Sequence, residues 1–127
     1  MTTPDSPVGV RYLVDDVDAA IAFYTTHLGF TLNMSAAPAF ADVTRGPLRL
    51  LLSGAASSGA RVTPADLASS PGRNRIHLVV DDLEAEVDRL GSAGVDFASG
   101  LVSGSGGSQI LLADPSGNLV ELFQPKG

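Results

Sequence analysis

Length, composition and charge exclude several classes of protein. The chain has 127 residues, enough for one domain with one sizeable core, and its lack of cysteine excludes disulfides, thiolate nucleophiles and zinc–thiolate sites. Its 14 Asp and Glu against 8 Lys and Arg give a formal net charge of −6, which makes nucleic acid an unfavourable partner. No apolar run reaches the roughly 18 residues of a membrane-spanning helix, and the opening MTTPDSPVG lacks the basic and apolar parts of an export signal. We therefore expect a cytoplasmic protein with no nucleic-acid or membrane partner.

The first half of the chain predicts one strand, one helix and three further strands. In VRYLVDDVDAAIAFYTTHLGF, residues 10–30, an apolar strand precedes a segment whose apolar residues recur at helical spacing. We expect Asp15 to cap this helix and Gly29 to end it. The β-type runs that follow predict strands at 31–35, 40–45 and 48–53.

The second half repeats this plan. IHLVVDDLEAEVDRLGSAGV, from residue 76, again places an apolar strand and a double Asp before an amphipathic helix, with Asp81 as the expected cap and Gly91 or Gly94 as the stop. Strands are predicted at 97–102, 108–113 and 119–124. SGSGGS, residues 103–108, precedes a strand instead of a helix, which favours a hairpin loop over a phosphate-binding loop.

The repeat predicts an α+β fold of two βαβββ modules within one domain. The first module covers about residues 8–53 and the second about residues 75–124. The segment between them, 54–74, is rich in Gly, Ala, Ser and Pro, so we interpret it as an exposed linker.

Strand alternation assigns faces to the candidate site residues. In DPSGNLVELFQP, residues 114–125, Glu121 and Phe123 share one side of the last strand. On the strand that opens the second module, Arg75 and His77 share a face, and Ile76 belongs to the opposite, apolar face. If the helix covers that apolar face, then Arg75, His77 and Glu121 lie together on the open one.

The two modules, with FYTTHLGF at 23–30 and DPSGNLVEL at 114–122, resemble the vicinal oxygen chelate superfamily. This superfamily includes glyoxalase I, extradiol dioxygenases, fosfomycin-resistance thiol transferases and bleomycin-resistance binding proteins. The resemblance implies that each module forms a half-barrel, that the two half-barrels enclose a central cup for a small-molecule ligand, and that the chain pairs as a homodimer.

The resemblance also implies four metal-ligand positions, and this sequence departs from the pattern at most of them. Counting from the double Asp and from the turn glycines places these positions at Gly9, Leu50, Arg75 and Glu121. At most His77 and Glu121 could act as ligands, whereas three or four groups are needed to hold a divalent ion. We therefore expect no metal cofactor.

The residues expected to contact a ligand share an inward position on the strands or an aromatic ring near the cup. They are Arg11, Phe40, Leu50, Arg75, His77, Phe97, Glu121 and Phe123. Glu121 could equally serve as the ion-pair partner of Arg75, because a half-buried carboxylate needs a cation or several donors. The phenylalanines could equally belong to the core, and Arg45 and Arg49 are expected to be solvated.

Three functions remain open at this point. The favoured one is metal-independent binding of a small hydrophobic or aromatic molecule, similar to sequestration by bleomycin-resistance proteins. The alternative is a glyoxalase-like lyase or isomerase, or a dioxygenase-like enzyme, in which His77 and Glu121 hold a metal. The third is metal-free acid–base catalysis by the same two residues.

Overall fold

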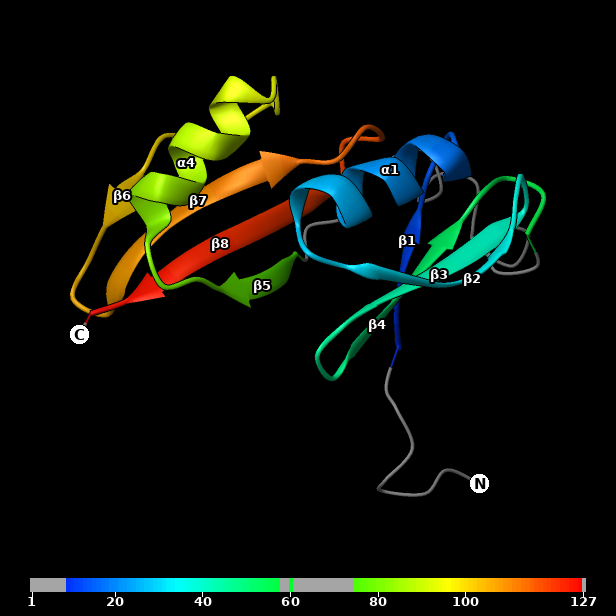
Figure 1. Cartoon of the computed structure of the whole chain (residues 1–127), viewed down its shortest axis with the longest axis horizontal. Coiled ribbons are helices and arrows are strands. Elements are labelled where there is room, and N and C mark those ends of the chain that lie inside the picture. Colours follow the sequence, from blue (N-terminus) through cyan, green and yellow to red (C-terminus); the bar gives the residue numbers. More distant parts are fainter. Residues whose placement is uncertain (1–8, 58–59, 61–74, 127) are drawn as a thin grey trace. The chain divides into compact units, whose positions relative to one another are not determined.

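The computed structural model describes residues 9–57, 60 and 75–126, so most of the expected linker at 54–74 lies outside the described residues. The chain divides into two compact units, 1–70 and 71–127, and each unit contains one sheet (Figure 1). In the part of the chain that the structure describes, no helix has the length and apolar character needed to cross a membrane.

The first unit is a four-stranded sheet in the order β1-β4-β3-β2, with one helix packed on it. Strand β1 runs parallel to β4, and the other neighbours are antiparallel. The elements are β1 (Gly9–Leu13), α1 (Val17–His27), β2 (Thr31–Ala36), β3 (Phe40–Arg45) and β4 (Leu48–Ser53).

Helix α1 begins one residue later than the sequence indicated. Asp16, not Asp15, is the N-cap, and its carboxylate accepts a hydrogen bond from the Ala19 backbone N–H at 3.1 Å. The predicted stop is confirmed, because Gly29 follows the helix with a φ of 72°.

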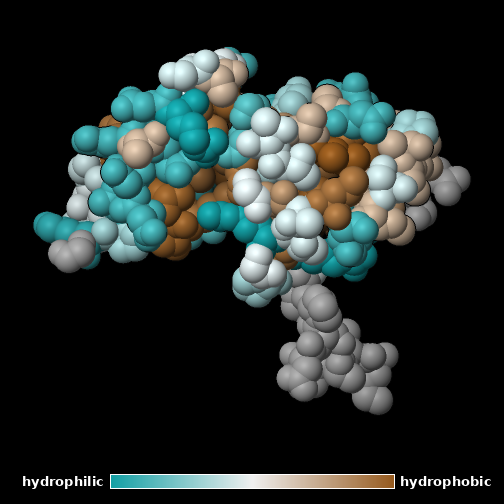
Figure 2. Space-filling view, viewed as in Figure 1, coloured by the Kyte–Doolittle hydropathy of each residue, from teal (hydrophilic) through white to brown (hydrophobic). Residues whose placement is uncertain are grey.

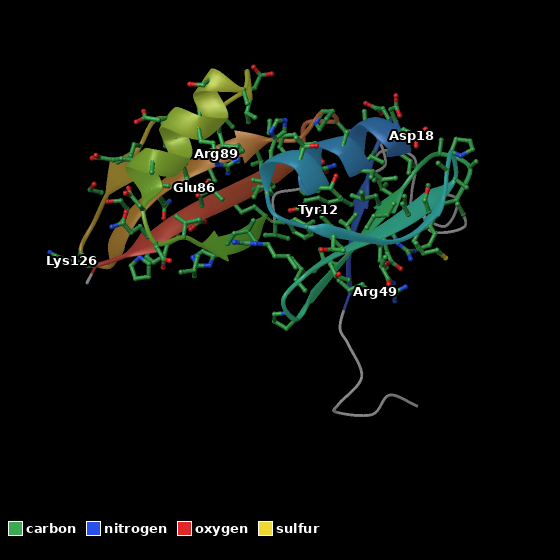
Figure 3. The ribbon with its side chains drawn as sticks, in the orientation of Figure 1. Tyr12, Asp18, Arg49, Glu86, Arg89 and Lys126 are labelled. Carbon is green, nitrogen blue, oxygen red and sulfur yellow. The ribbon has the colours of Figure 1, made fainter. Side chains whose placement is uncertain are left out.

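One face of the first sheet and α1 together form the core of this unit. Val43, Leu50 and Leu52 are completely buried on the sheet, as are Ala20 and Tyr24 on the helix. Figure 3 shows Tyr12 of β1 on the α1 side of the sheet and Arg49 of β4 on the side away from α1. Burial of each large apolar side chain contributes about 1.5–3 kcal/mol, so this face fixes the register of the strands.

The second unit repeats the arrangement, with strands in the order β5-β8-β7-β6 and β5 parallel to β8. The α+β fold of two βαβββ modules is thus confirmed, and each module has one open four-stranded sheet. The central cup expected between the half-barrels stays a prediction. The elements are β5 (Ile76–Val79), α4 (Leu83–Ser92), β6 (Val102–Ser103), β7 (Gly107–Ala113) and β8 (Leu119–Pro125).

Helix α4 packs its apolar side on one face of this sheet. Leu83 and Leu90 of α4 are buried, and so are Ile76 and Leu78 of β5. Figure 2 shows hydrophilic side chains over the outer surface of α4. As in the first unit, the N-cap is the second residue of the double Asp, because Asp82 accepts from the Ala85 backbone N–H at 3.1 Å.

The strand predicted at 97–102 is wrong over most of its length, because only Val102–Ser103 forms β6 and Phe97 makes one isolated bridge to Leu112. The Ser99 hydroxyl accepts from the Leu111 backbone N–H at 3.0 Å, in the place that a strand carbonyl would take. The hairpin loop predicted at 103–108 is confirmed, since β6 and β7 pair on either side of it.

Candidate functional site

A buried carboxylate on the open face of the second sheet organises the candidate site. Glu121 lies on β8 and is directly paired with His77 on β5, so the two side chains share a face. Only 8% of Glu121 is exposed. Arg75 Nε donates to Glu121 Oε1 at 2.8 Å, and His77 Nε2 lies 3.4 Å from Glu121 Oε2. Both carboxylate oxygens are therefore engaged by nitrogen atoms of neighbouring side chains.

Apolar and aromatic surface adjoins this polar cluster. Phe123, two residues beyond Glu121 on β8, has its ring centroid 5.1 Å from that of His77, at an interplanar angle of 36°. Val79, the next outward residue on β5, is 54% exposed although it is large and apolar. Small-molecule sites are mostly apolar and aromatic with a few placed polar groups, and this part of the open face carries both kinds of side chain.

The ion pair between Arg75 and Glu121, one of two roles left open by the sequence, is present. Desolvation of Glu121 is compensated by the charge-assisted hydrogen bond from the Arg75 guanidinium, as a buried carboxylate requires, and the His77 imidazole lies near the other oxygen. Arg75 and His77 keep about a third and a half of their side-chain surface exposed, at 36% and 49%. The cluster therefore presents donor groups to solvent above a carboxylate that it holds in place.

The open face of the first sheet carries a second polar cluster that sequence reasoning missed. Asp42 on β3 is 1% exposed, and Arg49 on β4 contacts its Oδ2 through Nε at 3.3 Å and Nη2 at 2.9 Å. The expectation that Arg49 is simply solvated is therefore wrong. Ser53, on the same face of β4, is also 1% exposed. Arg11 and Phe40 lie on this face too, as expected for residues of the open side.

Two of the predicted site residues lie on the helix side instead. Leu50 is completely buried and pairs with Val10 and Val43, so its position matches that of Val120 in the second module. The residue equivalent to Glu121 is Leu51, which pairs with Arg11 as Glu121 pairs with His77.

The one-residue error at Leu50 comes from the turns. Two residues connect β3 to β4, whereas five connect β7 to β8, so the turn glycines do not occupy equivalent places in the two hairpins.

Phe97 likewise packs toward the helix. It pairs with the buried Leu112, and its ring lies 3.7 Å from the place that a Cβ on Gly91 of α4 would take. The expectation that Phe97 lies on the open face is therefore wrong, because Phe97 is bridged to Leu112, a helix-facing residue of β7.

A surface pocket of about 420 Å³ lies elsewhere in the second unit, where the start of α4 meets the β6–β7 hairpin. Asp81, Asp82, Glu84 and Gln124 contribute to its lining, and Gln124 Oε1 accepts from the Leu83 backbone N–H at 2.8 Å. Its acidic groups belong to the helix start, on the opposite face of β8 from Glu121.

Comparison with protein families decides the family. The model of the Glyoxalase/Bleomycin resistance protein/Dioxygenase superfamily matches residues 8–122. The chain belongs to this superfamily. No curated protein sequence matches the chain.

Solved structures with similar folds come from proteins of different activities within the glyoxalase-like group. A lactoylglutathione lyase from Agrobacterium tumefaciens is 24% identical, with 97% of this chain and 96% of that chain covered and a TM-score of 0.72. TnmS3, an antibiotic-binding protein from Streptomyces sp. CB03234, is 25% identical, with 98% and 100% covered and a TM-score of 0.70. A glyoxalase-related enzyme from Fulvimarina pelagi is 18% identical, with 94% and 88% covered and a TM-score of 0.77.

The residues of this chain do not fit the metal site that the superfamily implies. With the register corrected, the four ligand positions hold Gly9, Leu51, Arg75 and Glu121, and only Glu121 has a side chain suited to a divalent ion. Both Glu121 oxygens already face cationic or imidazole nitrogens. Within the described ranges, no three His, Asp or Glu side chains gather closely enough to hold a metal.

Proposed function

We propose that this chain binds a small hydrophobic or aromatic molecule without a resident metal, and that it does so by sequestration, without turnover. The observation that carries the proposal is the set of contacts made by the buried Glu121 carboxylate. Oε1 accepts a hydrogen bond from Arg75 and Oε2 lies 3.4 Å from the His77 imidazole, so the carboxylate acts as an internal anchor for Arg75 and lies beside the His77 and Phe123 rings. The similarity to an antibiotic-binding protein supports this class of function, and antibiotic resistance is one biological role that it could serve.

Contact with the ligand is assigned to the exposed parts of the cluster. The partly exposed guanidinium of Arg75 and imidazole of His77 offer polar contacts, and Phe123 with Val79 offers flat apolar surface. Burial of apolar surface contributes about 25 cal/mol per Å², so an aromatic ligand gains most of its affinity from the apolar part and its orientation from the donors.

The test is a thermal-shift screen with flat aromatic and glycopeptide compounds, followed by calorimetry of the hits. A ligand at 100 times its dissociation constant adds about 2.7 kcal/mol of stability. Glu121→Gln weakens binding because it removes the charge that orients Arg75. Glu86→Gln is the matched control, since Glu86 forms an ion pair with Arg89 on α4 and takes no part in the Glu121 cluster. A screen without any shift, or equal effects of the two substitutions, contradicts the proposal.

Metal analysis separates binding from the enzymatic alternative. The alternative is a glyoxalase-like lyase or isomerase, or a dioxygenase-like enzyme, in which His77 and Glu121 would be metal ligands. Protein dialysed against metal-free buffer is expected to hold far less than one divalent ion per chain. About one ion per chain, retained through dialysis and lost in Glu121→Ala, overturns the metal-free proposal.

We also propose a homodimer in the cytoplasm as the functional form. The assembly is supported by the outer strands of the two sheets, since β2 exposes Leu32 and Met34 at 44% and 45%, and Val102 of β6 is 56% exposed. Uncovered edge strands with apolar side chains are normally protected by a partner. Sedimentation analysis tests the dimer, and a monomer at micromolar concentration contradicts it. The compartment rests on the sequence alone.

A further inference from the structure

Two buried polar atoms on the open face of the first sheet have no hydrogen-bond partner among the residues that the structure describes. They are Asp42 Oδ1 and Ser53 Oγ. Nearly all buried polar atoms in folded proteins are paired, so an unpaired carboxylate oxygen and an unpaired hydroxyl on one face point to a missing partner. Each atom exposes less than 1 Å² in this conformation, so a partner reaches either atom only when neighbouring side chains move.

The two atoms come from neighbouring strands and lie on the same face. Asp42 pairs directly with Leu51, and Ser53 is two residues beyond Leu51 on β4. Side chains in this diagonal relation have Cβ atoms about 7 Å apart, a distance that one small polar group can bridge with a hydrogen bond at each end.

The existing contacts of Asp42 leave one oxygen free. Arg49 places both Nε and Nη2 on Oδ2, although a guanidinium commonly engages both oxygens of a carboxylate. Arg49 also has a side chain that is 42% exposed, so it can move outward when a ligand approaches. The carboxylate can thus keep its charge partner while Oδ1 accepts from another group.

The charges on this face specify a neutral partner. Arg49 forms an ion pair with Asp42, and Arg11 lies on the same open face on the far side of Leu51, so the charge of Asp42 is already compensated and an added cation would be repelled. Asp42 Oδ1 can only accept, whereas Ser53 Oγ can donate or accept. An amide satisfies both, because its N–H donates to Asp42 and its C=O accepts from Ser53.

We infer that Asp42 and Ser53 form a hydrogen-bonding site for a neutral amide or hydroxyl group of the ligand, on the open face of the first module. This inference rests on the proposed binding function and extends it. The ligand class becomes an aromatic or hydrophobic molecule that carries an amide or hydroxyl, as opposed to a plain hydrocarbon or an amine. Phe40, which pairs with Ser53 and shares its face, is a suitable neighbour for the ligand's ring.

The test compares benzamide with N,N-dimethylbenzamide, which keeps the ring and carbonyl but has no N–H donor. Binding is followed by backbone amide NMR shifts in β3 and β4 of the full chain. We expect benzamide to bind about five- to tenfold more tightly, the equivalent of one neutral hydrogen bond. Benzylammonium is expected to bind more weakly than benzamide. Equal affinities of the two amides, or a preference for the cation, overturn the inference.

Ser53→Ala separates a binding role from a structural one. The substitution removes an unpaired buried hydroxyl, so the melting temperature is expected to stay the same or rise while benzamide affinity falls about five- to tenfold. Ser108→Ala is the matched control, because the Ser108 hydroxyl pairs with that of Ser103 on the exposed β6–β7 hairpin, and it should leave benzamide affinity unchanged. A lower melting temperature with unchanged affinity overturns the inference.

The same experiment distinguishes this inference from the proposed function. If aromatic compounds bind and respond to Glu121→Gln, but Ser53→Ala and the dimethyl group have no effect, only the Asp42 and Ser53 site is rejected. If no aromatic compound binds at all, both are rejected.

Discussion

The energetic link between Arg75 and Glu121 gives the sharpest test of the site geometry. Glu121 has a side chain only 10% exposed, and its contact with Arg75 Nε at 2.8 Å is a charge-assisted hydrogen bond. Such bonds contribute about 1.5–3 kcal/mol, and removing one partner of a fully buried pair costs about 3–5 kcal/mol. Because Arg75 is 36% exposed and His77 stays near the other oxygen, we expect Arg75→Met to cost about 2 kcal/mol.

A double-mutant cycle isolates the coupling free energy between Arg75 and Glu121. In a chain that carries Glu121→Leu, Arg75 has no carboxylate left to lose, so adding Arg75→Met should cost almost nothing and the coupling should be about 2 kcal/mol. The Arg89–Glu86 pair on α4 is the control. Its side chains are 49% and 32% exposed, and an exposed pair three residues apart on a helix contributes about 0.3–0.5 kcal/mol.

Amide hydrogen exchange of β5 and β8 is the appropriate assay, because it reports the opening free energy of the strands that carry or adjoin the pair. A coupling for Arg75 and Glu121 no larger than that of the α4 pair would refute the reasoning. Glu121 would then be well solvated, and it could not hold its two neighbours in place.

Two further predictions test local structure with matched substitutions. Asp82→Ala should cost about 1 kcal/mol in denaturant unfolding because it removes the α4 N-cap, whereas Asp81→Ala should cost less than about 0.5 kcal/mol; equal costs contradict the assigned cap. Gly107→Ala should disrupt the β6–β7 hairpin, since its Cβ would lie 2.2 Å from the Gln124 carbonyl oxygen at a φ of 151°. Gly104→Ala meets nothing within 4 Å and should leave the circular dichroism and melting temperature unchanged; similar losses in both would show that the hairpin tolerates no side chain for another reason.

The fold was predictable because most of its signals are local and repeated. The double Asp before each helix, the glycine after it and the alternation of the strands gave both modules with two strands, β3 and β4, at their observed bounds. The grouping of Arg75, His77 and Glu121 was also predictable, because the side-chain period of a strand is two and the opposite face of β5 is apolar. These features depend on few residues and little tertiary context.

The errors arise where a side chain replaces a backbone group or where turn length varies. Ser99 takes over a ladder contact, so the strand expected at 97–102 is reduced to its end. Nothing in the sequence clearly indicated that Arg49 would bond only one carboxylate oxygen of Asp42, because FADVTR, residues 40–45, has the pattern of an ordinary strand with one acid. Its only trace was an acid in an otherwise half-buried run, the same signal that marked Glu121.

Comparison of the two open faces suggests how a duplicated module diverged in chemistry. Position 121 of the second module holds an acid with both oxygens engaged, whereas its counterpart Leu51 is apolar and the acid lies on the adjacent strand at Asp42. The carboxylate of Glu121 is held by Arg75, the residue before β5, and that of Asp42 is held by Arg49 from β4, which leaves Asp42 Oδ1 free. The same scaffold therefore supplies a paired carboxylate at Glu121 in the second module and an unpaired acceptor at Asp42 in the first. Of the two, only Asp42 gains a hydrogen bond when a ligand with a neutral donor binds.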